Sequence, residues 1–207
     1  MKKLFSLSVI IFCFLVSGFA QTGYIINGNI SNLNNNSKIY LIDGSQSKII
    51  DSAVAKNGRF LLKGKLANAV HTYLYEGKSN KLADILLDNR QIFVTGSSPD
   101  YDSIKVNGSE IDSQWKEWYA EDQKLGYLKY QLNKVYQELL KNQDTTNTYK
   151  LNIIINQISD DRVIMLKKYV KKYKNTAAGA ALPTLCLLQN QLTKADFLEM
   201  YNSLSKT

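Results

Sequence analysis

The sequence is poor in the residues that build metal centres and disulfide frameworks. Its 207 residues include two cysteines and one histidine. A disulfide scaffold needs several paired cysteines, and zinc sites draw on clusters of cysteine and histidine. A disulfide framework, a zinc-finger cluster and a multi-histidine metal site are therefore excluded, and we expect neither a metal nor a cofactor. The chain is nevertheless 44% hydrophobic and 21% charged, which is typical of a folded protein with a real core.

Motifs that would identify a chemical reaction are also missing. There is no Cys-x-x-Cys pair and no glycine-rich phosphate loop. His71 lies in a strand pattern between Val70 and Thr72 without a nucleophile motif, which favours a structural or surface role over a catalytic triad. Neither acidic pair, Asp100 with Asp102 or Asp160 with Asp161, has the spacing of a calcium loop or an acid–base dyad. We therefore expect a protein that is not an enzyme.

The first twenty residues have the pattern of a secretory signal peptide. Lys2 and Lys3 precede an apolar stretch over residues 4–16, and small residues lead to a cleavage point near Ala20. About 13 apolar residues are too few to cross ~30 Å of hydrocarbon, so we expect no transmembrane span. The residues before Cys13 are large, which argues against lipid attachment there. The sequence predicts export to the periplasm or envelope of a Gram-negative bacterium.

Removal of this leader would leave Cys186 as the one cysteine of the mature chain, with a net charge of +6 instead of +8. An intramolecular disulfide is then impossible. Leucines surround Cys186 in the sequence, and no cationic residue is adjacent, so a buried and inert thiol is favoured over a reactive one. Cys186 remains the candidate thiol of the chain.

The mature sequence divides near residue 110 into a strand-rich part over residues 21–110 and a helical region over residues 111–207. In the first part, short apolar runs alternate with turn residues about every ten positions, and Asn57-Gly58 is a strong signal for a type I′ hairpin. We expect an antiparallel β-sandwich or open barrel. The predicted strands are Tyr24–Ile30, Lys38–Ile42, Ile49–Ala55, Arg59–Lys63, Val70–Tyr75, Asp84–Leu87, Gln91–Thr95 and Ile104–Val106.

The second part has the periodicity of long helices, which makes the fold class α+β. From Ile111 to Leu139 the apolar residues recur at steps of three, four and seven, after a cap at Ser109 or Asp112. Residues 142–148 read as a turn, and a second long helix then runs to about Asn175. We expect the two helices to form an antiparallel hairpin. Two shorter helical segments follow, over residues 177–189 and 194–204, the second with a capping pattern at its start.

Two groups of residues invite a binding role. The candidate basic patch consists of Lys167, Lys168, Lys171, Lys172 and Lys174. It would suit an anionic partner, although lysines at a helix end are also typical of a solvated surface. The aromatic group would suit a glycan or an interface, with core packing as the alternative: Trp115, Trp118, Tyr119, Tyr127, Tyr130 and Tyr136. The chain has 23 lysines but three arginines, which, together with export, argues against a nucleic-acid partner.

Several motifs of the strand-rich part form a familiar series. They are Gly28-Asn29-Ile30, Lys38-Ile39-Tyr40-Leu41, Asp51-Ser52-Ala53, Asn57-Gly58-Arg59-Phe60, Gly64, Ile85-Leu86-Leu87-Asp88, Ile92-Phe93-Val94-Thr95-Gly96 and Val106-Asn107-Gly108-Ser109. Together they resemble the uncharacterised β-rich N-terminal domain of many exported thiol-disulfide oxidoreductases. In those proteins a helical segment and then a thioredoxin-like domain of the alkyl hydroperoxide reductase type follow. The resemblance covers about residues 22–110 well and carries no catalytic residue, and we expect the thioredoxin-like domain to be absent here.

These observations predict a non-catalytic envelope protein that binds or positions something. One alternative is an accessory role in periplasmic thiol-disulfide exchange, in which Cys186 or the surface would serve a separate thioredoxin-like partner. Another is a glycan- or lipid-binding module that uses the tyrosines or the lysines. Self-association is a further possibility for the partner.

Overall fold

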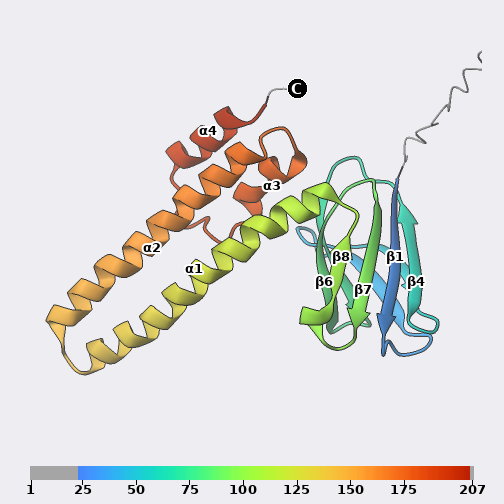
Figure 1. Cartoon of the computed structure of the whole chain (residues 1–207), viewed down its shortest axis with the longest axis horizontal. Helices are drawn as coiled ribbons and strands as arrows, with labels where there is room; N and C mark the ends of the chain where they lie inside the picture. Colours follow the sequence, from blue (N-terminus) through green and yellow to red (C-terminus); the bar gives the residue numbers. More distant parts are fainter. Residues whose placement is uncertain (1–22, 206–207) are drawn as a thin grey trace, which may run out of the picture.

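The computed structural model describes residues 23–205 and contains eight strands followed by four α-helices (Figure 1). The predicted leader, its cleavage point and Cys13 lie outside the described residues. The strands are β1 (Tyr24–Ser31), β2 (Lys38–Asp43), β3 (Ile49–Val54), β4 (Arg59–Gly64), β5 (Val70–Glu76), β6 (Asn80–Leu87), β7 (Gln91–Ser97) and β8 (Lys105–Asn107). A 3₁₀ turn, η1 (Tyr101–Ser103), precedes β8. The α+β class is therefore confirmed.

The strands form two four-stranded sheets, in the orders β4-β1-β7-β8 and β3-β2-β5-β6. All pairs are antiparallel except β1 with β7, which are parallel. The antiparallel prediction was wrong for this pair. Between β1 and β7 the chain forms β4 and the whole second sheet, so β7 joins β1 through a long crossover and not through a hairpin. Alternate residues of both sheets point inward, and Ile26, Ile39 and Ile92 are among the residues fully buried between them.

The Asn57-Gly58 turn forms, but it does not join two paired strands. Both residues have positive φ, at 49° and 76°, as a type I′ turn requires. Only one bridge, Lys56 with Arg59, closes the turn, after which β3 pairs with β2 and β4 pairs with β1. The turn therefore passes the chain from one sheet to the other, which helps to make a sandwich of the strands.

The helices are α1 (Glu110–Lys141), α2 (Thr145–Lys172), α3 (Ala177–Leu185) and α4 (Lys194–Ser203). The hairpin of α1 and α2 forms as predicted and projects away from the sandwich (Figure 1). The predicted turn over residues 142–148 was too long, because Asp144 caps α2 by accepting a hydrogen bond from the Asn147 amide at 3.0 Å. Helix α2 also ends three residues before Asn175. No helix among residues 23–205 is long and apolar enough to cross a membrane.

The short helix α3 ends earlier than the sequence predicted. Cys186 has an extended backbone, with φ −67° and ψ 141°, so the segment beyond Leu185 is not helical. Residues 187–191 then form a turn. Cys186 and Leu188 are fully buried, whereas Leu187 between them is 77% exposed.

Strand β6 connects the sandwich core to a second core within the helical region. Ile85 and Leu87 point into the sandwich, whereas Leu86 between them points to the other side and packs with Trp115, Trp118 and the helices. All three residues are buried, since helix α1 covers the outer face of the strand. The helical region therefore rests on the β5–β6 edge of the second sheet.

Candidate functional site

A cleft lies where the outer face of strands β5 and β6 meets the helical region. Its volume is about 450 Å³, within the ≈300–1,000 Å³ range of small-molecule sites. We call it the junction cleft. Its lining residues are Gly44, Ser45, His71, Tyr73, Lys81, Asp84, Trp115, Tyr119, Thr184, Leu185, Leu187 and Gln189.

The alternation of β5 supplies one wall of the cleft. His71 and Tyr73 are two residues apart, so both project from the outer face of the sheet. Their rings lie 4.9 Å apart in an edge-to-face arrangement. Gly44, in the neighbouring turn, leaves room for the histidine, because a Cβ there would lie 2.8 Å from His71 Nδ1.

A β-bulge in β6 places two charged side chains on the same wall. The register shifts between Leu74 and Tyr75, so that β6 has one extra residue opposite this step. Without the bulge, residues three apart would face opposite sides of the sheet. With it, Lys81 and Asp84 meet, and Lys81 Nζ lies 2.7 Å from Asp84 Oδ2.

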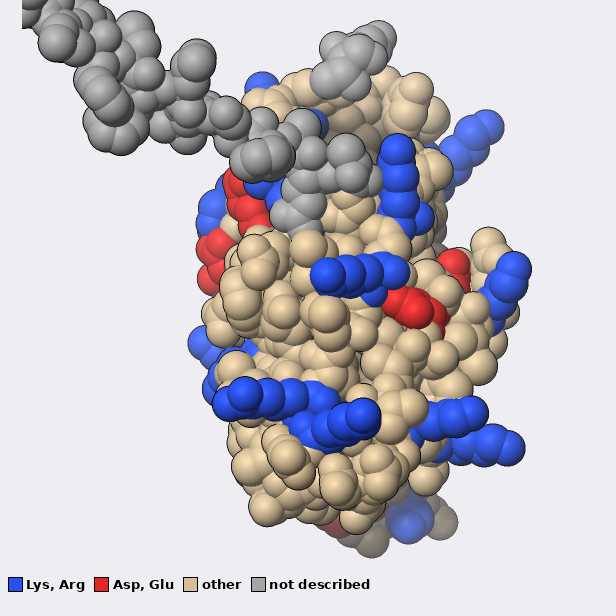
Figure 2. Space-filling model, turned by 90° about the vertical axis from the view of Figure 1, so that its right-hand side faces the viewer, with Lys and Arg blue, Asp and Glu red and all other residues tan. Residues whose placement is uncertain are grey.

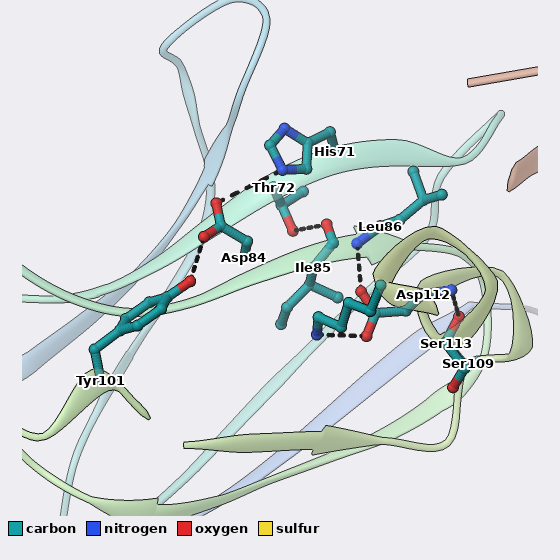
Figure 3. Close-up of polar contacts among 10 residues, drawn as sticks. His71, Thr72, Asp84, Ile85, Leu86, Tyr101, Ser109, Asp112 and Ser113 are labelled. Atoms are coloured by element: carbon teal, nitrogen blue, oxygen red, sulfur yellow. Dashed lines mark hydrogen bonds and ion pairs between the residues drawn. The ribbon is translucent and has the colours of Figure 1, made fainter. Parts of the chain in front are cut away.

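Asp84 is the centre of the polar contacts in the cleft (Figure 3). Besides the Lys81 pair, it accepts a 2.5 Å hydrogen bond from the Tyr101 hydroxyl, and His71 Nε2 lies 3.6 Å from its other oxygen. Burial acts to raise the pKa of Asp84, but His71, Lys81 and Tyr101 outweigh burial and lower this pKa to about 2. Burial and the neighbouring carboxylate raise the pKa of Tyr101. The cleft therefore holds a carboxylate that is ionised at neutral pH.

Helix α1 supplies the opposite wall. Trp115 and Tyr119 are four residues apart and so share one side of the helix, with ring centroids 5.7 Å apart. Trp115 also meets the His71 ring edge-to-face at 5.1 Å. The indole Nε1 of Trp115 is buried without a hydrogen-bond partner among the described residues. Four aromatic rings from two elements thus surround the cleft, and Lys81 Nζ lies 4.5 Å from the centroid of Tyr73.

A buried carboxylate fixes α1 against the sheet. Ser109 caps the helix and accepts from the Asp112 amide, and Asp112 Oδ1 accepts from the Leu86 amide at 2.8 Å (Figure 3). Because β6 is an edge strand, this amide has no strand partner on that side. Burial raises the pKa of Asp112, although Lys116 at 2.6 Å opposes this effect. The anchor sets the position of Trp115 above β5.

The hydroxyl groups of the cleft are not arranged for catalysis with His71. The Ser45 hydroxyl donates to Asp43 at 2.6 Å, and the Thr184 hydroxyl donates to the Ala181 carbonyl at 2.8 Å. A triad needs a nucleophile that hydrogen-bonds the histidine. The His71–Asp84 pair therefore belongs to the aromatic wall of the cleft.

The candidate thiol lies outside the cleft. Cys186 is fully buried, and its Sγ donates to the Pro183 carbonyl at 3.3 Å. Burial raises the pKa of the Cys186 thiol, which disfavours the thiolate needed for exchange.

The candidate basic patch is partly neutralised by neighbouring helices. Lys167 pairs with Asp196 and Glu199 of α4, each at 2.6 Å, and Lys172 pairs with Glu117 of α1 at 2.5 Å. The five lysines therefore do not act as one block of positive charge.

The sandwich end of the molecule shows no basic patch among the described residues either. In Figure 2, basic side chains are spread over this end rather than gathered in one place.

The acidic pairs considered in the sequence have local roles. Asp100 caps η1 by accepting from the amides of Asp102 and Ser103, and Asp161 accepts from Gln157. Among residues 23–205, no group of three or more potential ligands is placed to hold a metal ion.

Of the aromatic candidates, the structure brings Trp115 and Tyr119 to the cleft and buries Trp118 in the helical core. Tyr127 and Tyr130 are exposed on the hairpin, far along α1 from the cleft. Sequence reasoning assigned no site role to Tyr73, Lys81 or Asp84. The alternating His71, Tyr73 and Tyr75 were a usable signal, since a solvated strand face is seldom so aromatic.

The protein is a two-sheet sandwich followed by a helical region, and the helical region forms one wall of a cleft over the outer face of the second sheet. Residues 24–115 match the family described as "Domain of unknown function (DUF4369)". The match covers the sandwich and the first turns of α1, up to the cleft residue Trp115. No curated protein and no solved structure matches the chain. The family description names no catalytic activity and provides no link to thiol-disulfide oxidoreductases.

Proposed function

We propose that the protein is a non-catalytic binding module, exported to the cell envelope, and that the junction cleft is its binding site. The observation that carries this proposal is the convergence of four aromatic rings and an ionised carboxylate–ammonium pair on one cleft. Apolar walls with a few placed polar groups are typical of ligand sites. The hydroxyl groups of Ser45 and Thr184 donate hydrogen bonds to groups other than His71, which supports a binding role rather than a catalytic one.

The lining favours a neutral, polyhydroxylated ring, such as a sugar unit of an envelope glycan. The rings of Tyr73, Trp115 and Tyr119 offer flat apolar surface for the C–H face of a sugar. Asp84 can accept a hydrogen bond from a sugar hydroxyl, and Lys81 can donate one to a sugar hydroxyl. Because Lys81 neutralises Asp84, the pair gives little attraction for a net charge of either sign.

An accessory role in thiol-disulfide exchange is not favoured as a covalent mechanism. The burial of Cys186 and the raised pKa of its thiol both oppose attack on a partner disulfide. If a thioredoxin-like protein is positioned by this module, we expect the contact to be non-covalent. Capture of such a partner from envelope extracts should then be the same with and without reductant.

The glycan proposal is tested by titrating the purified protein with soluble oligosaccharides while recording tryptophan fluorescence and binding heat. The chain has two tryptophans, and Trp115 lines the cleft whereas Trp118 does not. We expect a binding oligosaccharide to change the emission of the wild type and of Trp118→Phe, but not that of Trp115→Phe.

The matched variants are Tyr73→Ala and Tyr75→Ala, because both tyrosines lie on the same strand and face but only Tyr73 lines the cleft. Loss of one stacking ring removes ~1 kcal/mol of aromatic contact, which should weaken binding by about fivefold. Equal weakening by the two substitutions, or no binding of neutral oligosaccharides at all, would exclude the proposed ligand class.

A further inference from the structure

The outer half of the α1–α2 hairpin is long, projecting and poorly covered. Every buried residue of α1 lies at or before Asp122, although the helix continues to Lys141. Beyond the buried, bidentate pair of Asp122 with Arg162, the two helices contact mainly each other (Figure 1). A two-helix hairpin buries only part of its apolar surface by itself.

One row of apolar residues runs along each helix of the outer hairpin. On α1, Leu128, Leu132, Val135 and Leu139 follow steps of four, three and four. On α2, Leu151, Ile154 and Ile158 follow steps of three and four, although Ile158 is buried. Leu128 and Val135 are each 46% exposed and Ile154 is 51% exposed.

An ion pair shows that these two faces lie on the same side of the hairpin. Glu117 of α1 and Lys172 of α2 meet at 2.5 Å, so both point to one side. Val135 follows Glu117 by 18 residues, and Ile154 precedes Lys172 by 18 residues. Since about 18 residues make five full turns, each apolar residue lies on the same side as its charged counterpart. We call this surface the apolar face of the hairpin.

The rest of the described chain leaves this face open. Helix α4 contacts α2 through Lys167, which lies about 140° around the helix from Lys172. The other broad side of the outer hairpin carries Asn133, Asn152 and Asn156 together with the exposed Tyr130 and Tyr149. The apolar face of the hairpin has no partner within residues 23–205.

The dimensions of the face suit a dimer. An α-helix is about 10 Å wide and rises 1.5 Å per residue. Two adjacent helices, measured from Glu117 to the tip of the hairpin, therefore present an area of roughly 700–800 Å² on one side. A standard protein interface takes about 800 Å² from each partner.

The charges beside the apolar residues are self-complementary. Lys150 and Asp161 lie three turns apart on the same side of α2 as Lys172, and their midpoint falls beside Ile154. If α2 packs antiparallel on α2 of a second copy about that midpoint, each Lys150 meets an Asp161. Lys150 forms no ion pair among the described residues.

We propose that two copies of this chain associate through the apolar faces of their hairpins and form an antiparallel four-helix bundle. The two-fold axis passes near Ile154, with Leu128, Val135 and Ile154 at the centre of the interface. Lys150 pairs with Asp161 across it on both sides. The sandwiches then lie at opposite ends of the dimer, which leaves both junction clefts open.

Sedimentation velocity over a range of concentrations tests this proposal. We expect twice the monomer mass for the wild type, and at least a tenfold weaker dimer for Ile154→Lys, since it would bury a charge in the interface. The matched control is Ile153→Lys, because Ile153 is 53% exposed but lies about 100° around the helix. A monomeric wild type at all concentrations, or equal effects of the two lysines, would overturn the proposal.

Charge exchange provides a test that does not depend on a disturbed core. Lys150→Glu and Asp161→Lys should each weaken the dimer, because each places like charges opposite one another. The double variant should restore most of the wild-type affinity, since the pairs re-form with their signs reversed. A double variant that is as weak as the single variants would contradict the antiparallel arrangement.

Discussion

At the scale of single residues, Asp84 links the electrostatics of the junction cleft to its shape. Its carboxylate receives Lys81 and Tyr101 and faces His71, so one side chain orders groups from β5, β6 and η1. Its side chain is 16% exposed, which keeps these contacts partly shielded from water. The lowered pKa keeps Asp84 ionised, and so able to accept from both groups, at neutral pH.

The low pKa of Asp84 predicts an acid-sensitive part of the stability. The folded-state pKa of about 2 lies below the ordinary value of 3.8, so the carboxylate stabilises the folded state above about pH 4. This contribution should decline as the pH falls from about 4 to about 2. Denaturant unfolding of the wild type and of Asp84→Asn measures it. The variant should be less stable at neutral pH, and the difference should shrink in acid. A difference that stays constant between about pH 6 and pH 2 would contradict this assignment.

At the scale of elements, the contact between α1 and β6 positions the cleft. The Asp112 carboxylate receives the free edge amide of Leu86, and the Leu86 side chain enters the helical core. One strand residue therefore joins the two halves of the molecule through both its backbone and its side chain.

Removal of this anchor should loosen the junction more than it unfolds the sandwich. Asp112→Ala leaves the Leu86 amide without its acceptor, which costs about 1–3 kcal/mol. We expect faster hydrogen exchange at Leu86 and in the first turns of α1, with little change in β1 and β7. Asp112→Asn, which keeps an acceptor oxygen, should have a smaller effect. Unchanged exchange at Leu86 in the alanine variant would show that the anchor does not hold α1.

The sequence allowed the elements to be predicted well because their signals are local. Alternating residues marked the strands, the step of three and four marked α1 and α2, and Ser109 and Thr193 cap helices as expected. The start of β6 was missed, since the bulge at Leu82 breaks its alternation. The parallel pairing of β1 with β7 and the change of sheet at Asn57-Gly58 could not be read from local pattern. Both depend on contacts between distant segments.

The cleft was less predictable than the fold for the same reason. Trp115 and Tyr119 were recognised as candidates, but their partners Tyr73 and Asp84 come from strands about 30–45 residues earlier. Only the docking of α1 on β6 brings these groups together. The lysine cluster, in contrast, was visible in the sequence, while the acidic residues that neutralise part of it are on other helices.

At the scale of the whole molecule, the chain joins a sandwich that carries one wall of a cleft to helices that carry the other. The hairpin formed by α1 and α2 projects away from the sandwich (Figure 1), and we propose it as a separate surface for a second copy. The proposed ligand site and the proposed dimer interface lie at opposite ends of α1. We therefore expect substitutions at Ile154 to leave oligosaccharide binding unchanged, and substitutions at Tyr73 to leave the dimer unchanged.

Chemical-shift mapping of the purified protein with its tightest-binding neutral oligosaccharide tests the central claim most directly. The account predicts that perturbed amides concentrate in β5, β6, the first turns of α1 and residues 184–189, and that the indole N–H of Trp115 shifts. Perturbations centred on the outer hairpin or on the β4-β1-β7-β8 sheet, with the Trp115 indole unmoved, would contradict it.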